Sequence, residues 1–184
     1  MIITKEQKAL ARENLEENIG SGLNCCESVF NALIRAGIVD LPEEMTCLAS
    51  GMGGGTGLTG KTCGALVAAA MSIGAEYGRR DPIGDHAKML KSVAGKDDVK
   101  DPTQDYRYYM MRRFNRVVAD FQEEIGTTQC QEIVDSCGGY KNKRRQNACE
   151  NCMRTALKIA IRYLEMPQEE ADKLAYGRNL FGWE

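Results

Sequence analysis

Eight cysteines are the residues of this sequence best suited to chemistry. They stand at Cys25, Cys26, Cys47, Cys63, Cys130, Cys137, Cys149 and Cys152. A cysteine thiolate is a nucleophile, a redox group and a ligand for soft metals. In a secreted chain so many cysteines would predict a disulfide framework, whereas in a reducing compartment they indicate metal or redox chemistry.

The amino-terminal segment favours the reducing compartment. It contains no apolar signal region, because charged residues begin at Lys5. No stretch reaches the roughly 18 apolar residues of a spanning helix, and the run from Cys63 to Ile73 comes nearest. The sequence therefore predicts a cytoplasmic protein without a membrane span.

The bulk composition is that of one globular domain. The 184 residues are 43% hydrophobic and 27% charged, and we expect a single helical domain over residues 1–184. A formal net charge of −2 argues against a nucleic-acid partner, which usually requires a basic surface. The short basic run over residues 141–145 is expected to be a solvated loop, with anion binding as the weaker alternative.

The pattern of caps, breakers and apolar residues predicts helices and no strands. The predicted helices span about residues 5–18, 25–35, 42–50, 63–77, 101–126, 128–136, 147–165 and 167–176. Their expected caps or first residues are Thr4, Asn24, Pro42, Thr62, Asp101 with Pro102, Thr128, Asn147 and Pro167. We therefore expect an all-α multi-helix bundle with a glycine-rich loop over residues 51–60.

Two predicted helices carry faces that belong in a core. The helix over residues 63–77 is rich in Ala and Gly, which predicts close packing against a neighbour and leaves a homodimer open. The long helix carries an apolar stripe at the helical period. The stripe consists of Tyr106, Met110, Phe114, Val117, Val118, Phe121 and Ile125.

Four predicted helix starts carry a cysteine within their first two positions. The pairs of cap and cysteine are Asn24 and Cys25, Thr62 and Cys63, Thr128 and Cys130, and Asn147 and Cys149. A helix amino terminus offers unpaired N–H groups and partial positive charge, both of which favour a thiolate. The plain alternative is that these are scattered core cysteines beside chance caps.

The helix dipole alone is too weak to activate these thiols. One helix terminus contributes about 0.3–1 kcal/mol, which is less than the roughly 1.4 kcal/mol of one pKa unit. If the four starts met, their thiolates would repel one another and raise the pKa values again. A metal or an iron–sulfur cluster would remove that repulsion, so the hypothesis depends on the four thiols converging.

The order of these motifs resembles the C_GCAxxG_C_C family over about residues 9–163. The motifs that carry the resemblance are the run from Gly22 to Val29, Gly53-Gly54-Gly55 leading to Cys63-Gly64-Ala65, Gly126 to Cys130, and Cys149 with Met153 and Ala156. The family is described as redox-active proteins related to the cysteine-bearing region of split-Soret cytochromes. The resemblance places the four family cysteines on Cys25, Cys63, Cys130 and Cys149. Ala68 stands where the motif has its last glycine, and Cys26, Cys47, Cys137 and Cys152 are additional.

Together, residues and resemblance favour a redox protein that holds an iron–sulfur cluster for electron transfer. Its redox-active ligands would be the four family cysteines, with Cys26 and Cys152 as alternates. Gly53, Gly54 and Gly55 would let the backbone pass close to the bound group and donate N–H groups. An oxidoreductase and an electron carrier both remain open, and the redox partner is unknown.

Two other uses of the cysteines remain open. The first is a metal-free dithiol/disulfide carrier that uses Cys149 and Cys152, a C-x-x-C pair, or a pair from different helices. The second is a structural zinc or interaction module, although Cys25 and Cys26 are adjacent rather than spaced as in a zinc pair.

Two further features carry less weight. Residues 55–62 satisfy the G-x-x-x-x-G-K-[ST] pattern of a phosphate-binding loop, but that motif must follow a strand, and a helix is predicted here. His86 is the only histidine and lies in a polar linker, so we expect a surface residue.

Overall fold

The protein is an assembly of helices, as the sequence predicts. A computed structural model describes residues 1–81, 83–84 and 106–177. Its helices are α1 (Lys5–Asn18), α2 (Cys25–Arg35), η1 (Glu43–Met52), α3 (Gly64–Tyr77), α5 (Tyr106–Ile125), α6 (Cys130–Ser136), α7 (Lys143–Glu165) and α8 (Gln168–Ala171). Within the described residues, extended pairing is limited to an isolated antiparallel bridge between Thr62 and Gln129. The all-α prediction is confirmed.

The first two helices begin where their capping boxes predict. The Thr4 side chain accepts a hydrogen bond from the N–H of Gln7, and the Gln7 side chain accepts one from the N–H of Thr4. Asn24 and Glu27 form the same reciprocal pair at α2. Each box satisfies N–H groups that a helix start would otherwise leave unpaired, and so fixes the first residue of its helix.

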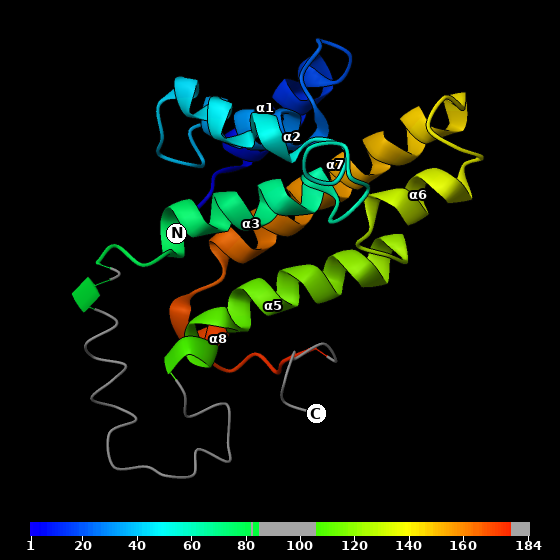
Figure 1. Cartoon of the computed structure of the whole chain (residues 1–184). Helices are drawn as coiled ribbons and strands as arrows, with labels where there is room; N and C mark the ends of the chain where they lie inside the picture. The colour runs from blue at the N-terminus through cyan, green and yellow to red at the C-terminus, as the bar shows by residue number, and fades with distance from the viewer. Residues whose placement is uncertain (82, 85–105, 178–184) are drawn as a thin grey trace.

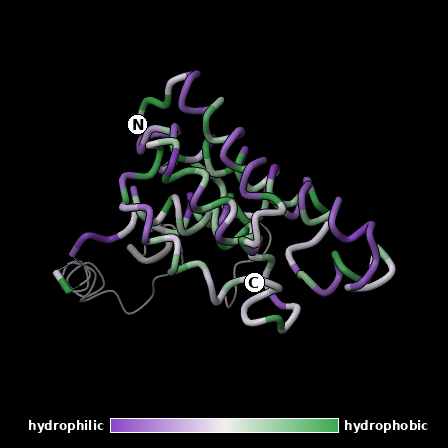
Figure 2. The backbone as a smooth tube through the Cα atoms, turned by 90° about the horizontal axis from the view of Figure 1, so that it is seen from above, coloured by the Kyte–Doolittle hydropathy of each residue, from purple (hydrophilic) through white to green (hydrophobic). Residues whose placement is uncertain are grey.

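Helix α3 lies at the centre of the bundle (Figure 1). It packs against both α2 and α7, and α5 packs against α7 as well as α3. The small side chains of Ala65, Ala68 and Ala69 are fully buried in these contacts. The predicted close packing of this helix is therefore confirmed within the chain itself. The hydropathy-coloured tube shows hydrophobic segments turned toward the interior and hydrophilic segments toward the outside (Figure 2).

The apolar stripe of the long helix is only partly core. Val117 and Phe121 are completely buried, and Phe114 and Ile125 pack against the core as partly buried side chains. Val118 is 38% exposed, so its predicted place in the core is wrong. It follows Val117 directly and is therefore turned toward the flank of the helix. The side chains of Tyr106 and Met110, the predicted start at Asp101 and Pro102, and His86 lie outside the described residues.

Several predicted caps are wrong. Cys63, not Thr62, is the N-cap of α3, because Thr62 lies in the bridge to Gln129. Gln129, not Thr128, precedes α6, and Asn142 rather than Asn147 caps α7. The Asn142 side chain accepts a hydrogen bond from the N–H of Arg144, so the helix begins inside the basic run predicted as a loop.

Three shorter predictions have mixed outcomes. The segment after Pro42 forms a 3-10 helix instead of an α-helix. α6 ends as predicted before Gly138 and Gly139, both of which adopt positive φ angles. The helix after Pro167 ends at Ala171, earlier than predicted.

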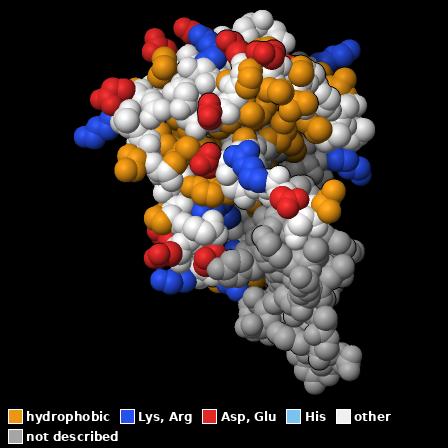
Figure 3. Space-filling model, turned by 90° about the vertical axis from the view of Figure 1, so that its left-hand side faces the viewer, with side chains coloured by type: hydrophobic (Ala, Val, Ile, Leu, Met, Phe, Trp, Pro, Cys, Tyr) orange, Lys and Arg blue, Asp and Glu red, His pale blue; other side chains and the backbone are white. Residues whose placement is uncertain are grey.

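The surface carries hydrophobic side chains gathered on one face of the molecule (Figure 3). Helix η1 contributes exposed apolar residues, among which Leu48 is 57% exposed. None of the helices in the described part of the chain combines the length and apolar content needed to cross a membrane.

Candidate functional site: a cluster of cysteines

The first cysteine is held in place at the start of α2. Cys25 is the first residue of this helix, and the capping box of Asn24 and Glu27 fixes its backbone. The same two side chains bind η1: Asn24 donates to the carbonyl of Ser50 at 3.1 Å, and Ser50 donates to Glu27 at 2.5 Å. The cap therefore joins the Cys25 helix to the segment that leads into the glycine-rich loop.

The glycine-rich loop brings the starts of α3 and α6 together. The N–H groups of Cys130 and Gln131 donate to the carbonyls of Lys61 and Gly60 at 2.7 and 2.8 Å. In the opposite direction, the N–H of Cys63 donates to the carbonyl of Thr128 at 2.8 Å. This short ladder fixes the backbone of Cys63 beside that of Cys130.

The loop itself has an unusual backbone. Thr56 and Leu58 adopt φ angles of 60° and 63°, in the left-handed region that non-glycine residues rarely occupy. Gly55 is buried at a φ of 75°, and a Cβ built there would stand 2.7 Å from the carbonyl carbon of Gly60. Strained backbone of this kind tends to occur at functional sites. The loop follows η1 rather than a strand, so it lacks the context of a phosphate-binding loop.

Gly64 allows the Cys25 sulfur to approach the start of α3. A Cβ built on Gly64 would stand 2.6 Å from the Sγ of Cys25 and 2.8 Å from the carbonyl oxygen of Met52. Any side chain at this position would therefore displace the sulfur or the loop. Gly64, directly after Cys63, leaves room for the Cys25 sulfur and so allows Cys25 to lie close to Cys63.

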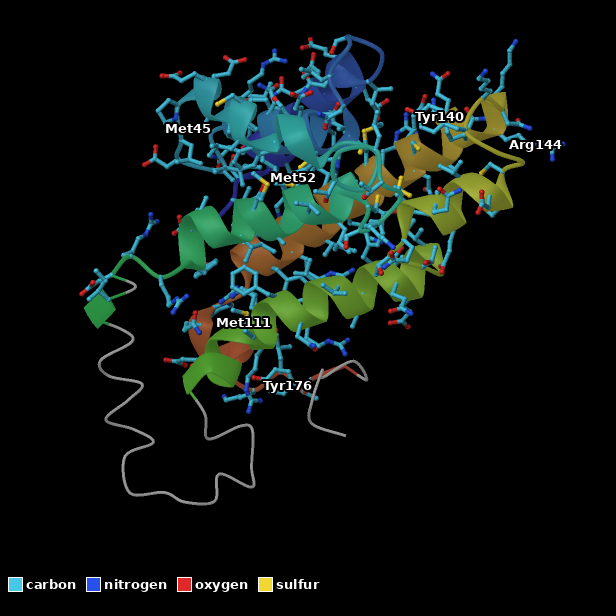
Figure 4. All side chains as sticks on the ribbon, viewed as in Figure 1. Met45, Met52, Met111, Tyr140, Arg144 and Tyr176 are labelled. Atoms are coloured by element: carbon cyan, nitrogen blue, oxygen red, sulfur yellow. The ribbon has the colours of Figure 1, made fainter. Side chains whose placement is uncertain are left out.

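Helix α7 supplies the remaining sulfur atoms. Cys149 is partly exposed, whereas Cys152, on the next turn, is 2% exposed. Cys63 interacts electrostatically with five other thiols, which makes it the centre of the cluster. These are Cys25, Cys26, Cys130, Cys149 and Cys152. Sulfur atoms gather beside the loop before α3, where α7 passes (Figure 4).

The structure thus brings together the four cysteines predicted as the site and both alternates. The two remaining cysteines lie elsewhere: Cys47 is exposed on η1, and Cys137 is at the carboxyl end of α6. Gly53 and Gly54 line a cavity beside the cluster. A hydrogen bond from the N–H of Gly54 lowers the pKa of Cys25, against the larger effect of burial.

Cys63 and Cys152 are linked by a hydrogen bond that changes the pKa of both thiols. A hydrogen bond from the Cys152 thiol lowers the pKa of Cys63, and the backbone N–H groups of Ala65 and Leu66 lower it further against the effect of burial. The same hydrogen bond raises the pKa of Cys152. Of these two thiols Cys63, at the N-cap of α3, is therefore the first to ionise.

The other cluster thiols are held neutral. Burial raises the pKa of Cys25, and charge on Cys63 raises it further. Burial followed by neighbouring thiolates raises the pKa of Cys26 to about 12 and that of Cys130 to about 11. Burial also raises the pKa of Cys149, although the charge of Arg145 acts in the opposite direction. In the reduced, ligand-free protein the cluster therefore holds one thiolate among neutral thiols.

The prediction that four helix starts each carry a cysteine in their first two positions is corrected by this arrangement. Cys149 lies beyond the first turn of α7, because that helix already begins at Lys143. Cys130 does begin α6, but its N–H group is bonded to the carbonyl of Lys61 instead of facing a sulfur. Helix-start N–H groups favour a thiolate at Cys63 and Cys25, whereas the backbone ladder positions Cys130 and the packing of α7 positions Cys149.

Two further residues at the cysteine cluster, Cys152 and Arg145, could have been predicted from their helical spacing. Cys152 lies three residues after Cys149, and Arg145 lies four residues before it, so all three share one face of α7. The sequence motifs predict Cys152 only as an alternate ligand and Arg145 only as part of a solvated run. The structure places both at the cluster, where each changes the pKa of a neighbouring thiol.

A cavity of about 610 Å³ opens beside the cluster. Cys25, Cys130 and Cys149 line it, with Arg145 and Tyr140 from the segment around the start of α7. Cys63 and Cys152 are behind this wall, at 5% and 2% exposure. Three thiols are thus reachable from the cavity, and the thiolate is one layer deeper.

The donor set of this site consists of thiols from several segments. Among the described residues, no group of three or more His, Cys, Asp or Glu side chains is arranged to hold a metal ion. Soft thiols from several segments, a backbone N–H near one sulfur and a glycine against another are features that an iron–sulfur cluster would use.

Comparison with known proteins gives one match. Residues 23–163 match the family described as "Putative redox-active protein (C_GCAxxG_C_C)". Neither the curated proteins nor the solved structures contain a match to this chain. The matched segment runs from the residue before the Asn24 cap to Tyr163 in α7 and so includes every cysteine of the cluster. The chain therefore belongs to the C_GCAxxG_C_C family of redox-active proteins.

Proposed function

We propose that this redox protein binds an iron–sulfur cluster through Cys25, Cys63, Cys130 and Cys149 and transfers electrons with it. The observation that carries the proposal is the convergence of these four thiols, from four separate segments, around Cys63. A bound cluster would supply one-electron redox chemistry, with a potential set by charge, burial and hydrogen bonds to sulfur.

The electrostatics of the site support a cationic occupant. Without one, burial and mutual repulsion keep Cys25, Cys130 and Cys149 protonated. Iron would deprotonate these thiols and offset their repulsion. The N–H of Gly54 would then donate to a ligating sulfur, and Arg145 would offset part of the remaining negative charge.

A cluster and a single ion would hold four thiols at different spacings. Around one zinc ion, Zn–S bonds of about 2.3 Å would place the four sulfurs within about 4 Å of one another. In an iron–sulfur cluster, irons and sulfides stand between the protein ligands, so these ligands lie farther apart. The proposal rests on the thiols that influence one another's pKa values, and iron and sulfide analysis decides between the two occupants.

Anaerobic purification followed by iron and acid-labile sulfide analysis tests this proposal. We expect iron and sulfide in the wild-type protein and their loss in the single variants C25S, C63S, C130S and C149S. Cys47 and Cys137 provide matched controls outside the cluster, so C47S and C137S should keep wild-type iron. A protein that contains no iron after anaerobic purification and reconstitution would overturn the proposal.

A second candidate function rests on the pair of Cys63 and Cys152. A thiolate that accepts a hydrogen bond from a neighbouring thiol is poised for disulfide exchange. Attack of the Cys63 thiolate on an external disulfide would form a mixed disulfide and release one thiolate. Cys152 would then displace the second thiol, so that the protein is oxidised by two electrons and the external disulfide is reduced by two.

Thiol counting separates the two functions. If the dithiol function is correct, treating metal-free protein with a small disulfide should remove two titratable thiols, and mass spectrometry should find a Cys63–Cys152 bond. C152A should instead accumulate the mixed disulfide at Cys63. If the wild-type protein keeps all its thiols under these conditions, the dithiol function is ruled out.

A further inference from the structure

Among the described residues that line the cavity beside the cysteine cluster, one cation lacks a carboxylate partner. Arg145 lines the cavity wall, and its guanidinium lies 4.2 Å from the centre of the Tyr140 ring. No Asp or Glu among the described residues forms an ion pair with it. Glu150 lines the same cavity, but it is paired with Arg154 at 3.2 Å and accepts a hydrogen bond from Gln146. Arg145 thus contributes a positive charge to the cavity wall, beside the Cys149 thiol with which it hydrogen-bonds.

Arg145 also has an unsatisfied donor. Its Nε–H is buried and has no acceptor among the described residues. A buried donor without an acceptor costs stability, so the side chain gains by turning toward an acceptor that enters the cavity. The Nε and Nη groups on one edge of a guanidinium match the two oxygens of a carboxylate. Stacking on Tyr140 already restricts the guanidinium, so less conformational freedom is lost when a ligand binds.

The remaining walls set the other properties of the ligand. Apart from the thiols and a few polar groups, they are apolar, with Leu23, Leu58, Val134 and Met153 among them. Pockets of this kind bind an apolar body and use a few polar groups to orient it. Because Arg145 is a single cation without a carboxylate partner in the described part of the chain, it suits a ligand that carries one negative charge. Three thiols on the same walls place the bound molecule against the cluster.

We propose that this cavity binds a small monocarboxylate with an apolar body, whose carboxylate is held by Arg145 beside Cys149. This inference concerns binding alone and does not depend on the presence of an iron–sulfur cluster. A small organic acid or an acidic thiol compound would satisfy the same chemistry.

Benzoate and its neutral analogue benzamide test the proposal by calorimetric titration of the full-length protein. We expect benzoate to bind at least ten-fold more tightly than benzamide to the wild-type protein. R145Q should abolish that preference, and R145K should retain part of it, because it keeps the charge without the planar donor edge. Arg144 is exposed, so R144Q removes an equal charge outside the cavity and should leave benzoate affinity within two-fold.

Protection of the thiols gives a second measurement that needs no variant. In the metal-free protein, benzoate should slow the alkylation of Cys149 by uncharged N-ethylmaleimide while leaving the rate at exposed Cys47 unchanged. Equal affinity for benzoate and benzamide, absence of benzoate binding, or unchanged preference in folded R145Q would each overturn the inference. Iron content, measured on the same samples, reports on the proposed function separately.

Discussion

The Sγ atom of Cys25 lies against the backbone of Gly64, where a Cβ would stand only 2.6 Å from the sulfur. This contact joins the start of α2 to the start of α3. It also explains the glycine after Cys63 in physical terms, because only a residue without a side chain leaves room for the neighbouring sulfur.

Gly64→Ala should therefore disturb both stability and the site. The added methyl group must displace the Cys25 sulfur or the carbonyl of Met52, and overpacking of this kind costs about 1–3 kcal/mol. Urea unfolding should show this loss, together with faster alkylation of Cys25. Gly74→Ala in the same helix is the control, since its Cβ would touch only Phe114 at 3.9 Å. Equal stability of the two variants would contradict the predicted crowding.

Asn24→Ala should loosen the Cys25 helix. Asn24 accepts hydrogen bonds from the N–H groups of Cys26 and Glu27, and loss of such a cap costs about 0.5–2 kcal/mol. The free energy of unfolding should fall by this amount. Asn24→Asp keeps the capping oxygen but loses the donor to Ser50, so it should retain most of the stability. A larger loss in the Asp variant than in the Ala variant would contradict the capping role.

Cys152→Ala should raise the pKa of Cys63. The hydrogen bond from Cys152 is the largest cause of the lowered value, and without it burial opposes the thiolate. In the metal-free wild type, the first thiol to ionise should have a midpoint below the ordinary value of about 8.5. Ultraviolet thiolate absorbance against pH should show the midpoint move upward in the Ala variant. Cys152→Ser retains a donor and should shift it less.

Alkaline pH should destabilise the reduced, metal-free protein through Cys26. Burial raises its pKa to about 12, so the folded state retains a proton that the unfolded state loses above about pH 8.5. The stability from this group is complete below that pH and falls as pH rises toward 12, by up to about 1.4 kcal/mol per pH unit. Chemical unfolding between pH 7 and pH 10 measures the slope.

Cys26→Ala provides the matching comparison for that slope. This variant removes the titrating thiol, so its stability should fall less steeply with pH, even if its stability at pH 7 is lower. Cys47→Ala alters an exposed thiol outside the cluster and should keep the wild-type slope. Parallel slopes in the Cys26 and Cys47 variants would contradict the assignment.

The sequence by itself determined the helix starts that depend only on residues close together in the chain. The capping boxes at Thr4 and Asn24 satisfy N–H groups within three residues, so both helix starts could be predicted correctly. The order of cysteine motifs along the chain is likewise sufficient to identify the family. The predicted cap of α7 is wrong because Asn142 and Asn147 offer similar local chemistry. The helix extends to the earlier of the two.

Tertiary structure alone decided which sulfur atoms meet. The ladder between Lys61 and Cys130 joins segments far apart in the chain, and it displaces Thr62 from the predicted cap. The hydrogen bond between Cys63 and Cys152 depends on how α3 packs against α7. Residue types determine which groups can hold charge, but pKa values depend on burial and on neighbours brought together by folding.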